Sequence, residues 1–332
     1  MRYRASTSVM LSLLLASMFI ISVPPVNALS TIRVGVAFDT GGPGDHSFDD
    51  AVVKGLAMAK KHFQFQVSAT VTIGSDQDRE MRLRALVTKG CNPIIAVGSA
   101  YAPALKRVAL DFPSTQFVIV NDATISMLNV TSLVFSENQG GYLAGVTAAL
   151  ATKTGRIGLV GWKNSRYEKG FTAGAREVNR NITIDIRYGA TVTLTNALIT
   201  SGSDVIFLTT PGSDSEVLNA VVVANTRAIK SGAAKVGLIV IEPDQYVSLP
   251  EGARNYILAS LVNRVDRGIV DVISESVSGR TVIDVLDSNM GIYGRRYGIA
   301  DRGIELSLWS PLVSKYRKVI NLAAIKAAKL LL

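Results

Sequence analysis

Cysteine and histidine are scarce in this 332-residue chain. Cys91 is the only cysteine, so the chain cannot form a disulfide within itself. It comes just before the apolar run Ile94–Val97 and is expected to be a small buried hydrophobe. The two histidines, His46 and His62, have no neighbouring ligands at metal-binding spacing. These absences exclude an intrachain disulfide scaffold and argue against a metal enzyme.

Catalytic motifs are missing as well. The chain has no Gly-x-Ser-x-Gly elbow, no Walker loop and no Cys–His arrangement. The run Gly155–Gly161 resembles dinucleotide-binding glycine spacing, but no suitable acidic residue follows the next strand. Asp39 and Asp45 provide carboxylates without any sign of a reacting centre between them. We therefore expect a binding protein with no catalytic residue, no metal and no cofactor.

Positive charge is in excess and is spread along the chain. Lys and Arg total 35 against 26 Asp and Glu, which gives a formal net charge of +9. The basic residues do not form a nucleic-acid-reading module, so no nucleic-acid partner is expected. The excess is compatible with a solvated surface near an anionic membrane.

The N-terminal residues 1–28 have the layout of a secretory signal peptide. Arg2 and Arg4 precede the apolar run Val9–Val23, and Val26-Asn-Ala28 offers a small-residue cleavage site. The run is short for a bilayer-spanning helix of about 20 residues. We expect an exported, extracytoplasmic protein at the cell surface or in a periplasm, with an uncleaved N-terminal anchor as the alternative. In an exported chain, Asn129-Val-Thr131 and Asn181-Ile-Thr183 are acceptor sequons for glycosylation.

The body of the chain alternates short apolar runs with amphipathic stretches, which predicts parallel sheets covered by helices. The expected strands are 32–38, 66–72, 93–97, 116–120, 132–135, 155–160, 182–188, 204–208, 235–241, 256–260 and 290–297. The expected helices are 50–62, 76–89, 102–111, 137–152, 192–201, 215–231 and 265–278. From residue 311 the tail has the pattern of a basic amphipathic helix. We expect it to pack on the protein, with contact to a membrane or partner as the alternative.

The stretch 34–56 combines a strand, a glycine-rich loop and a helix start. Open α/β sheets bind ligands at the carboxyl ends of their strands, and this strand ends at Asp39. Gly41 and Gly42 let the backbone approach a ligand, and Phe48 offers a flat apolar face. Helix capping is the alternative role for Asp45 and Ser47, and packing on the sheet is the alternative for Phe48.

This opening, Asp39-Thr-Gly-Gly42 and then Asp45-His-Ser-Phe-Asp49, resembles the start of the basic membrane protein family. Members of that family are ABC-transporter substrate-binding proteins of the type I periplasmic-binding fold, and they include purine nucleoside receptors. The likeness extends along almost the whole mature chain, through Glu137–Gly145, Gly170–Gly174 and Arg264-Val-Asp266. Asp49 stands where the family usually has Asn.

The resemblance implies an α/β fold of two Rossmann-like lobes with parallel sheets, joined by a hinge of several crossings. Its expected division is 1–28 signal peptide, 31–130 plus 256–288 lobe 1, 131–255 plus 289–310 lobe 2, and 311–332 C-terminal amphipathic helix. The crossings are expected near residues 129–135, 247–260 and 286–292.

The resemblance also implies a ligand site made by loops of both lobes. Phe48 would stack on a nucleobase, and acidic groups would bind base and ribose, with Asp244 preferred over Glu242 as the ribose acceptor. Asn121 stands where the family often has Asp, and Asn263 stands where it commonly has Lys. The full implied set is Asp39, Gly41, Gly42, Asp45, Ser47, Phe48, Asn121, Asp122, Gly212, Glu242, Asp244 and Asn263.

The implied function is that of an exported solute-binding protein which closes its lobes around a small polar ligand. A purine nucleoside is the expected ligand, an ABC permease in the membrane is the expected partner, and the protein is expected to be a monomer. A receptor of the same fold that signals to a membrane partner is one alternative. A nucleoside-processing enzyme is the other.

Overall fold

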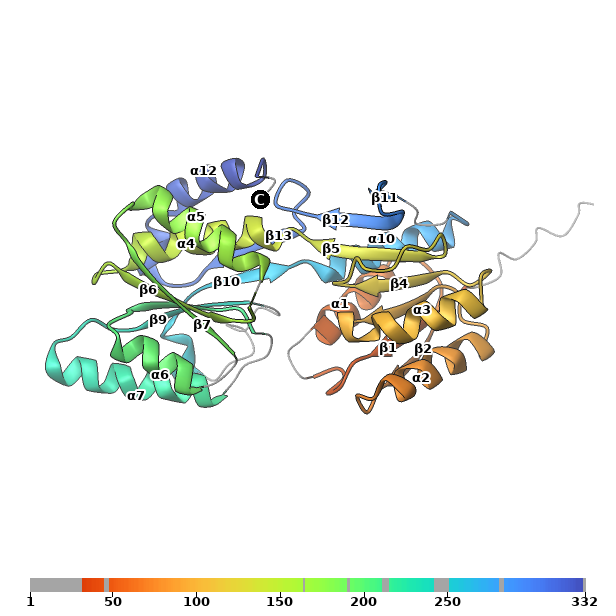
Figure 1. Cartoon of the computed structure of the whole chain (residues 1–332), viewed down its shortest axis with the longest axis horizontal. Helices are drawn as coiled ribbons and strands as arrows, with labels where there is room; N and C mark the ends of the chain where they lie inside the picture. The colour runs from red at the N-terminus through yellow and green to blue at the C-terminus, as the bar shows by residue number, and fades with distance from the viewer. Residues whose placement is uncertain are drawn as a thin grey trace, which may run out of the picture. The chain divides into compact units, whose positions relative to one another are not determined.

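The computed structural model describes residues 32–44, 48–163, 165–189, 192–210, 215–241, 251–280 and 284–330. In these ranges strands and helices alternate along the chain, as the sequence predicts, and the strands form two sheets (Figure 1). Residues 1–31 lie outside the described ranges, so the signal peptide stays a prediction. No helix in the described ranges is long and apolar enough to cross a membrane.

The first sheet has seven strands in the order β11-β12-β5-β4-β3-β1-β2. They are β1 (Arg33–Phe38), β2 (Gln66–Val71), β3 (Ile94–Val97), β4 (Phe117–Val120), β5 (Val130–Phe135), β11 (Val285–Asp287) and β12 (Ile292–Tyr297). All neighbouring strands are parallel except β11 and β12. Every residue of β3 and β4 is buried, as expected for parallel strands that are covered on both faces.

Helices cover both faces of this sheet because successive strand residues point to opposite sides. They are α1 (Phe48–Ala59), α2 (Asp76–Thr88), the 3-10 turn η1 (Ser99–Tyr101), α3 (Ala102–Asp111) and α10 (Val265–Val277). Val34 and Val36 share a core cluster with Val52 of α1 and Ile269 of α10. Ala37 points the other way, into a cluster with the buried residues of α2 and α3.

The second sheet has six strands in the order β13-β10-β9-β8-β6-β7, and only the β10–β13 pair is antiparallel. Its strands are β6 (Arg156–Gly161), β7 (Thr183–Tyr188), β8 (Val205–Leu208), β9 (Gly237–Ile241), β10 (Ile257–Asn263) and β13 (Ile304–Leu308). Its helices are α4 (Glu137–Ala151), α5 (Arg166–Val178), α6 (Val192–Thr200), α7 (Ser215–Ser231), α9 (Glu251–Arg254), α11 (Pro311–Ser314) and α12 (Arg317–Ala327). Phe171 of α5 stacks on Phe207 of β8, whereas Leu198 of α6 belongs to the cluster on the opposite face.

Helices α4 and α5 approach each other backbone to backbone. A Cβ atom added at Gly145 would overlap the carbonyl oxygen of Phe171, and one added at Gly170 would overlap the carbonyl oxygen of Asn138. Any side chain larger than hydrogen would therefore push the two helices apart. This close approach explains the small residues in the stretches Glu137–Gly145 and Gly170–Gly174.

Three crossings connect the two sheets, and they lie elsewhere than the sequence predicts. The chain passes from the first sheet to the second at 135–137, back at 263–265, and over again at 297–304. β12 pairs with β5 in the first sheet, although residues 289–310 were expected in lobe 2. β10 pairs with β9 and β13 in the second sheet, although residues 256–288 were expected in lobe 1. The remaining lobe boundaries stay predictions.

The crossings are hydrogen-bonded to one another. Ser136 donates from its backbone N to the carbonyl oxygen of Tyr297 at 2.8 Å, and Arg264 donates in the same way to Gly303 at 2.8 Å. Backbone groups in a buried linker need such partners, because an unpaired group there is costly. The three segments therefore form one connected strip.

Asn129, the first residue of a predicted glycosylation sequon, is buried. Its Nδ2 donates to the carbonyl oxygens of Ala109, Phe112 and Thr115 at 3.0, 3.2 and 3.2 Å. A glycan would replace one of the two N–H donors of this buried amide and has no room there, so of the two sequons only Asn181, whose side chain is exposed, remains accessible.

Candidate functional site

Two of the predicted site residues, Asp39 and Asn121, lie at the carboxyl edge of the first sheet. Asp39 follows β1 and Asn121 follows β4, and Gly98 follows β3 between them. A Cβ atom at Gly98 would lie 3.5 Å from Oδ2 of Asp39, so the two loops touch. Gly41 and Gly42 have φ values of 97° and 64°, which suit glycine far better than other residues. The glycine-rich loop therefore needs both residues for its shape.

Asp39 is held by a cation from a neighbouring helix. Arg79 of α2 donates from Nη2 to Oδ1 of Asp39 at 2.9 Å and from Nη1 to the carbonyl oxygen of Gly74 at 2.7 Å. Its guanidinium also lies 5.6 Å from the ring centre of Tyr101. The Asp39 side chain is 31% exposed, so one carboxylate is oriented by arginine and still reachable from solvent.

Tyr101 stabilises the end of β1, directly before Asp39. Its ring is fully buried, and its hydroxyl donates to the carbonyl oxygen of Phe38, the residue before Asp39, at 2.8 Å. Burial, followed by the charge of Asp39, raises the pKa of the Tyr101 hydroxyl well above its ordinary value. Tyr101 therefore remains a neutral donor that fixes the end of β1.

Phe48 begins α1 and is half-buried. It packs against the core cluster that contains Val52 and Ile269. The ring therefore has a packing role, which was the alternative stated from sequence, and it keeps a partly exposed surface beside the glycine-rich loop. The two roles are compatible because an aromatic ring has two faces and an edge.

Asn121 and Asp122 lie in the turn after β4. Asn121 has a φ of 63°, an uncommon value for a residue with a side chain, and its backbone N donates to the carbonyl oxygen of Leu133 at 2.8 Å. Asp122 accepts bonds from the backbone N and the hydroxyl of Thr124 at 2.8 and 2.7 Å. The Asp122 carboxylate therefore stabilises the turn through its hydrogen bonds with Thr124.

Glu137, the first residue of α4, was not among the predicted site residues. Burial raises the pKa of its carboxyl, while the charge of Arg166 and a hydrogen bond with Asn121 act in the opposite direction. Loss of hydration and then the charge of Arg166 lower the pKa of Arg296 in β12. Glu137 thus contacts Asn121, and the charge of Arg166 acts on both Glu137 and Arg296. An acidic residue two positions after the apolar strand β5, at the start of α4, is the sequence signal that could have identified Glu137.

Asn263, at the end of β10, is buried with 1% exposure. Its Nδ2 donates to the hydroxyl of Tyr167 at 2.9 Å, and the Tyr167 ring meets Phe207 edge-on at 5.8 Å. The amide of Asn263 therefore orients Tyr167.

Trp162 is a second residue that sequence reasoning missed. It follows β6 at the carboxyl edge of the second sheet and is 58% exposed. A large exposed aromatic at the ligand-binding edge of an α/β sheet is a candidate stacking surface. Its position directly after an apolar strand is the signal that could have revealed it.

Five predicted site residues lie outside the described part of the chain. They are Asp45, Ser47, Gly212, Glu242 and Asp244. Their roles stay predictions. Within the described ranges, no group of three or more His, Cys, Asp and Glu residues could hold a metal ion.

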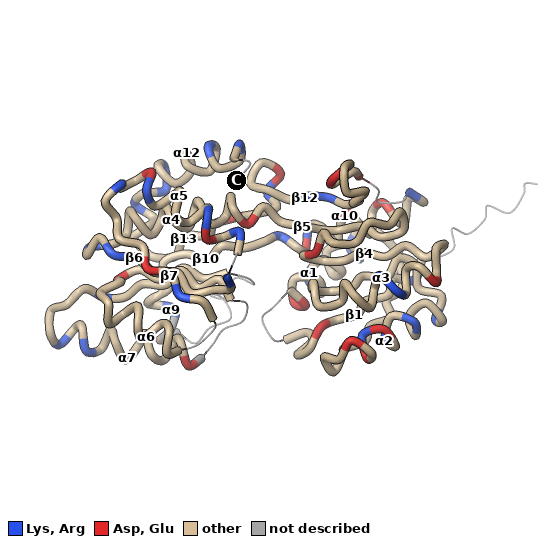
Figure 2. Tube along the Cα trace, in the orientation of Figure 1, with Lys and Arg blue, Asp and Glu red and all other residues tan. Residues whose placement is uncertain are grey.

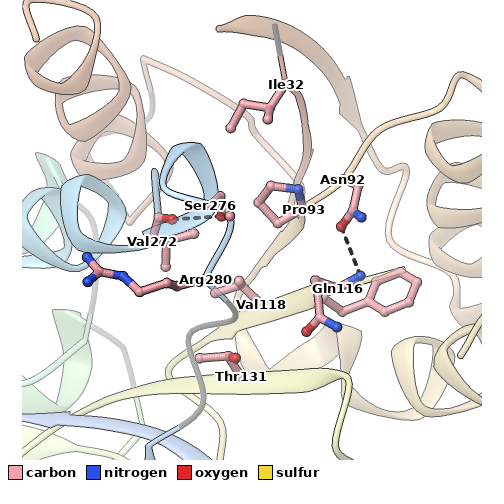
Figure 3. A pocket seen from close by; sticks show the side chains of 11 residues that line it. Ile32, Asn92, Pro93, Gln116, Val118, Thr131, Val272, Ser276 and Arg280 are labelled. Carbon is pink, nitrogen blue, oxygen red and sulfur yellow. Dashed lines mark hydrogen bonds between the residues drawn. The ribbon is translucent and has the colours of Figure 1, made fainter. Parts of the chain in front are cut away.

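A hollow of about 200 Å³ lies at the opposite edge of the first sheet (Figure 3). Ile32 precedes β1, Pro93 precedes β3 and Gln116 precedes β4, so this hollow is at the amino ends of these strands. Its volume is below the roughly 300–1,000 Å³ of typical ligand pockets. The polar groups around Asp39 therefore remain the better candidate site.

Solved structures share this fold. A transcriptional activator of the comK gene from Bacillus halodurans has a TM-score of 0.71 at 22% identity, over 90% of this chain and 98% of that one. An ABC transporter system solute-binding protein from Aeropyrum pernix K1 has a TM-score of 0.67 at 22% identity, over 91% and 82% of the two chains. Two mostly parallel α/β sheets with three crossings define a protein of the type I periplasmic-binding fold.

The family follows from a family model described as "Bmp: ABC transporter substrate-binding protein PnrA-like", which matches residues 32–328. This chain belongs to that family of substrate-binding proteins, so the resemblance seen in the opening motif is confirmed. A relative named ABC transporter nucleoside-binding protein BmpA, from Lactococcus lactis subsp. cremoris, is 29% identical over 268 residues. That match covers 75% of this chain and 76% of the relative.

Proposed function

We propose that this protein binds a purine nucleoside outside the cytoplasm and presents it to an ABC permease in the membrane. The observation that carries the proposal is the oriented, reachable carboxylate of Asp39 beside Gly41 and Gly42 at the carboxyl edge of a parallel sheet. A carboxylate accepts hydrogen bonds from ring N–H groups and from ribose hydroxyls. The name of the Lactococcus relative, which states nucleoside binding, supports the same ligand class.

Aromatic faces complete the proposed site. Phe48 provides a partly exposed ring next to the glycine-rich loop, and Trp162 provides an exposed ring at the edge of the second sheet. Stacking on a base contributes about 1–3 kcal/mol per base. In this proposal Asp244 accepts from the ribose hydroxyls.

The protein acts by differential affinity and performs no catalysis in this proposal. A ligand shifts a two-state protein toward the state that it binds better. The connected strip of crossings at 135–137, 263–265 and 297–304 is a suitable hinge for such closure, because rigid lobes can rotate about a few linking segments. The protein works as a monomer.

Intrinsic fluorescence offers a direct test, because Trp162 and Trp309 are the only two tryptophans. Trp309 is half-buried and donates from Nε1 to Oγ of Ser260 at 3.1 Å, away from the proposed site. Guanosine, adenosine and inosine should change the fluorescence of the wild type and of Trp309→Phe at the same concentrations. Free ribose should not. A signal that is absent with nucleosides but present with sugars would overturn the ligand class.

Three further observations separate the alternatives. A mass spectrum of ligand carried through purification should show a nucleoside. Labelled nucleoside incubated with the protein should be recovered unchanged, whereas conversion to base or nucleotide would show an enzyme. Permease and ATPase genes beside the coding gene would support transport, and a sensor-kinase gene there would support the receptor alternative.

A further inference from the structure

The C-terminal helix α12 presents two different faces. Ile320 and Ala327 are buried, and they belong to a small cluster with Tyr142 and Val146 of α4. This face fixes the helix on the protein, as the sequence predicts. The opposite face has no packing role of this kind.

The outer face of α12 exposes aliphatic side chains. Leu322 is 67% exposed, Ile325 is 61% exposed and Val319 is 47% exposed. Residues three apart lie on neighbouring positions of a helix surface, so the three form one stripe. A hollow of about 360 Å³ continues this apolar surface toward α4 and α5, where Leu150 and the partly exposed Val178 line it.

Positive charges predominate beside the stripe, and Glu177 of α5 is the acidic residue that lines the hollow. Lys318 and Lys326 are exposed and lie on the same side of the helix as Leu322, and the exposed Lys329 follows the end of the helix. The stretch 311–330 contains five Lys and Arg and no Asp or Glu. Figure 2 shows these basic positions along α12. Lys326 pairs with Glu177 of α5, and Lys318 and Lys329 are not part of a described ion pair.

We propose that the outer face of α12 docks on an anionic lipid surface. Helices that lie in a membrane interface combine an apolar face with lysine and arginine, and the long lysine stems keep their charges at headgroup level. A second copy of this chain would place like charges face to face, which is unfavourable. The complementary partner is therefore a surface of negative headgroups above an apolar layer. Docking here is independent of the ligand site and would hold the protein at the membrane.

Site-directed nitroxide labelling of the full chain tests this proposal locally. Cys91 is buried at 2% exposure, so a new cysteine will take the label. Leu322→Cys and Ile325→Cys place labels on the stripe, and Leu110→Cys, 62% exposed on α3, is the control. Vesicles of phosphatidylcholine mixed with phosphatidylglycerol are compared with phosphatidylcholine alone. Collision rates with oxygen and with a water-soluble nickel complex report immersion.

On the anionic vesicles, labels at positions 322 and 325 should become more accessible to oxygen and less accessible to nickel, while the label at position 110 should not change. Lys318→Gln combined with Lys329→Gln should lower the equilibrium constant for immersion about thirtyfold, equivalent to about 1 kcal/mol per charge. The matched control, Lys60→Gln with Lys61→Gln, should have no effect. Labels that stay aqueous on anionic vesicles would overturn the proposal. So would spin–spin broadening without vesicles, which would indicate self-association through this face.

Discussion

Arg79 donates a hydrogen bond from Nη2 to Oδ1 of Asp39 at 2.9 Å, and this bond joins α2 to the loop after β1. The Arg79 side chain is only 13% exposed, so its guanidinium group is largely shielded from water. The Asp39 carboxylate remains accessible to a ligand from solvent. The pair orients an acceptor before any ligand arrives. Preorganisation of this kind lowers the cost of binding.

Arg79→Gln should therefore weaken nucleoside binding about tenfold, or about 1.4 kcal/mol, because Asp39 would lose its fixed orientation. Titration calorimetry with guanosine measures the loss. Arg82→Gln is the control, since Arg82 lies on the same helix but pairs with Asp78 at 3.2 Å. Equal losses in both variants would show that the effect comes from α2 in general.

Phe48→Ala should cost about 1–3 kcal/mol of nucleoside affinity, a loss of about ten- to a hundredfold, if the ring stacks on a base. Phe48 also packs on the core, so thermal unfolding must be measured beside affinity. Phe63→Ala is matched to it, because Phe63 is half-buried against the same cluster. Affinity should fall only in the Phe48 variant. A similar fall in both would point to packing alone.

Asp244→Asn should weaken ribonucleosides more than free bases, because the lost acceptor matters only when ribose hydroxyls are present. Calorimetry with guanosine and guanine, and with adenosine and adenine, gives this comparison within one variant. If base and nucleoside weaken equally, the ribose role of Asp244 is refuted.

Gly145→Ala should destabilise the protein by about 3 kcal/mol or more, since the new methyl group would overlap the backbone of Phe171. Urea unfolding measures this change. Gly252→Ala is the control: it lies in α9 with no atom within 4 Å of an added Cβ. There alanine should be neutral or should stabilise the helix by up to about 1 kcal/mol. A small effect at Gly145 would mean that α4 and α5 can separate at little cost.

The loss of folding stability at acidic pH should depend on the carboxyl group of Asp266. Burial raises the pKa of its carboxyl, but hydrogen bonds from Arg264 and Lys54 outweigh that effect and hold the pKa below its ordinary value of 3.8. The folded state therefore favours the charged form. The resulting stability is present above the ordinary pKa and is lost as pH falls through the lowered folded pKa.

Asp266→Asn should accordingly reduce the free energy of unfolding by about 1–3 kcal/mol at pH 7, because two donors lose their charged acceptor. The difference from wild type should shrink below about pH 4. Denaturant unfolding from pH 2 to pH 7 measures it. Asp111→Asn removes an exposed pair with Arg84 and should change little. A difference that is constant with pH would contradict the assigned charge state.

The sequence predicted the fold class and most elements to within one or two residues. Helix α7 is the clearest case, since 215–231 is both the predicted and the observed span. Apolar runs and amphipathic periodicity lie within short stretches of sequence, so they can be recognised without knowledge of tertiary contacts. The α5 helix and the β13 strand were not predicted. The opening motif also placed Asp39 correctly at the end of β1.

The amino-acid sequence by itself thus determined the alternation of strands and helices, the family and the polar residues at strand ends. The tertiary structure alone decided that β12 joins β5, that β10 joins the second sheet, and that Arg79 reaches Asp39. It also decided that Asn129 and Asn263 are buried and that Trp162 is exposed. Strand pairing, ion pairing and burial depend on residues far apart in the chain, and a local pattern does not record which of them come together.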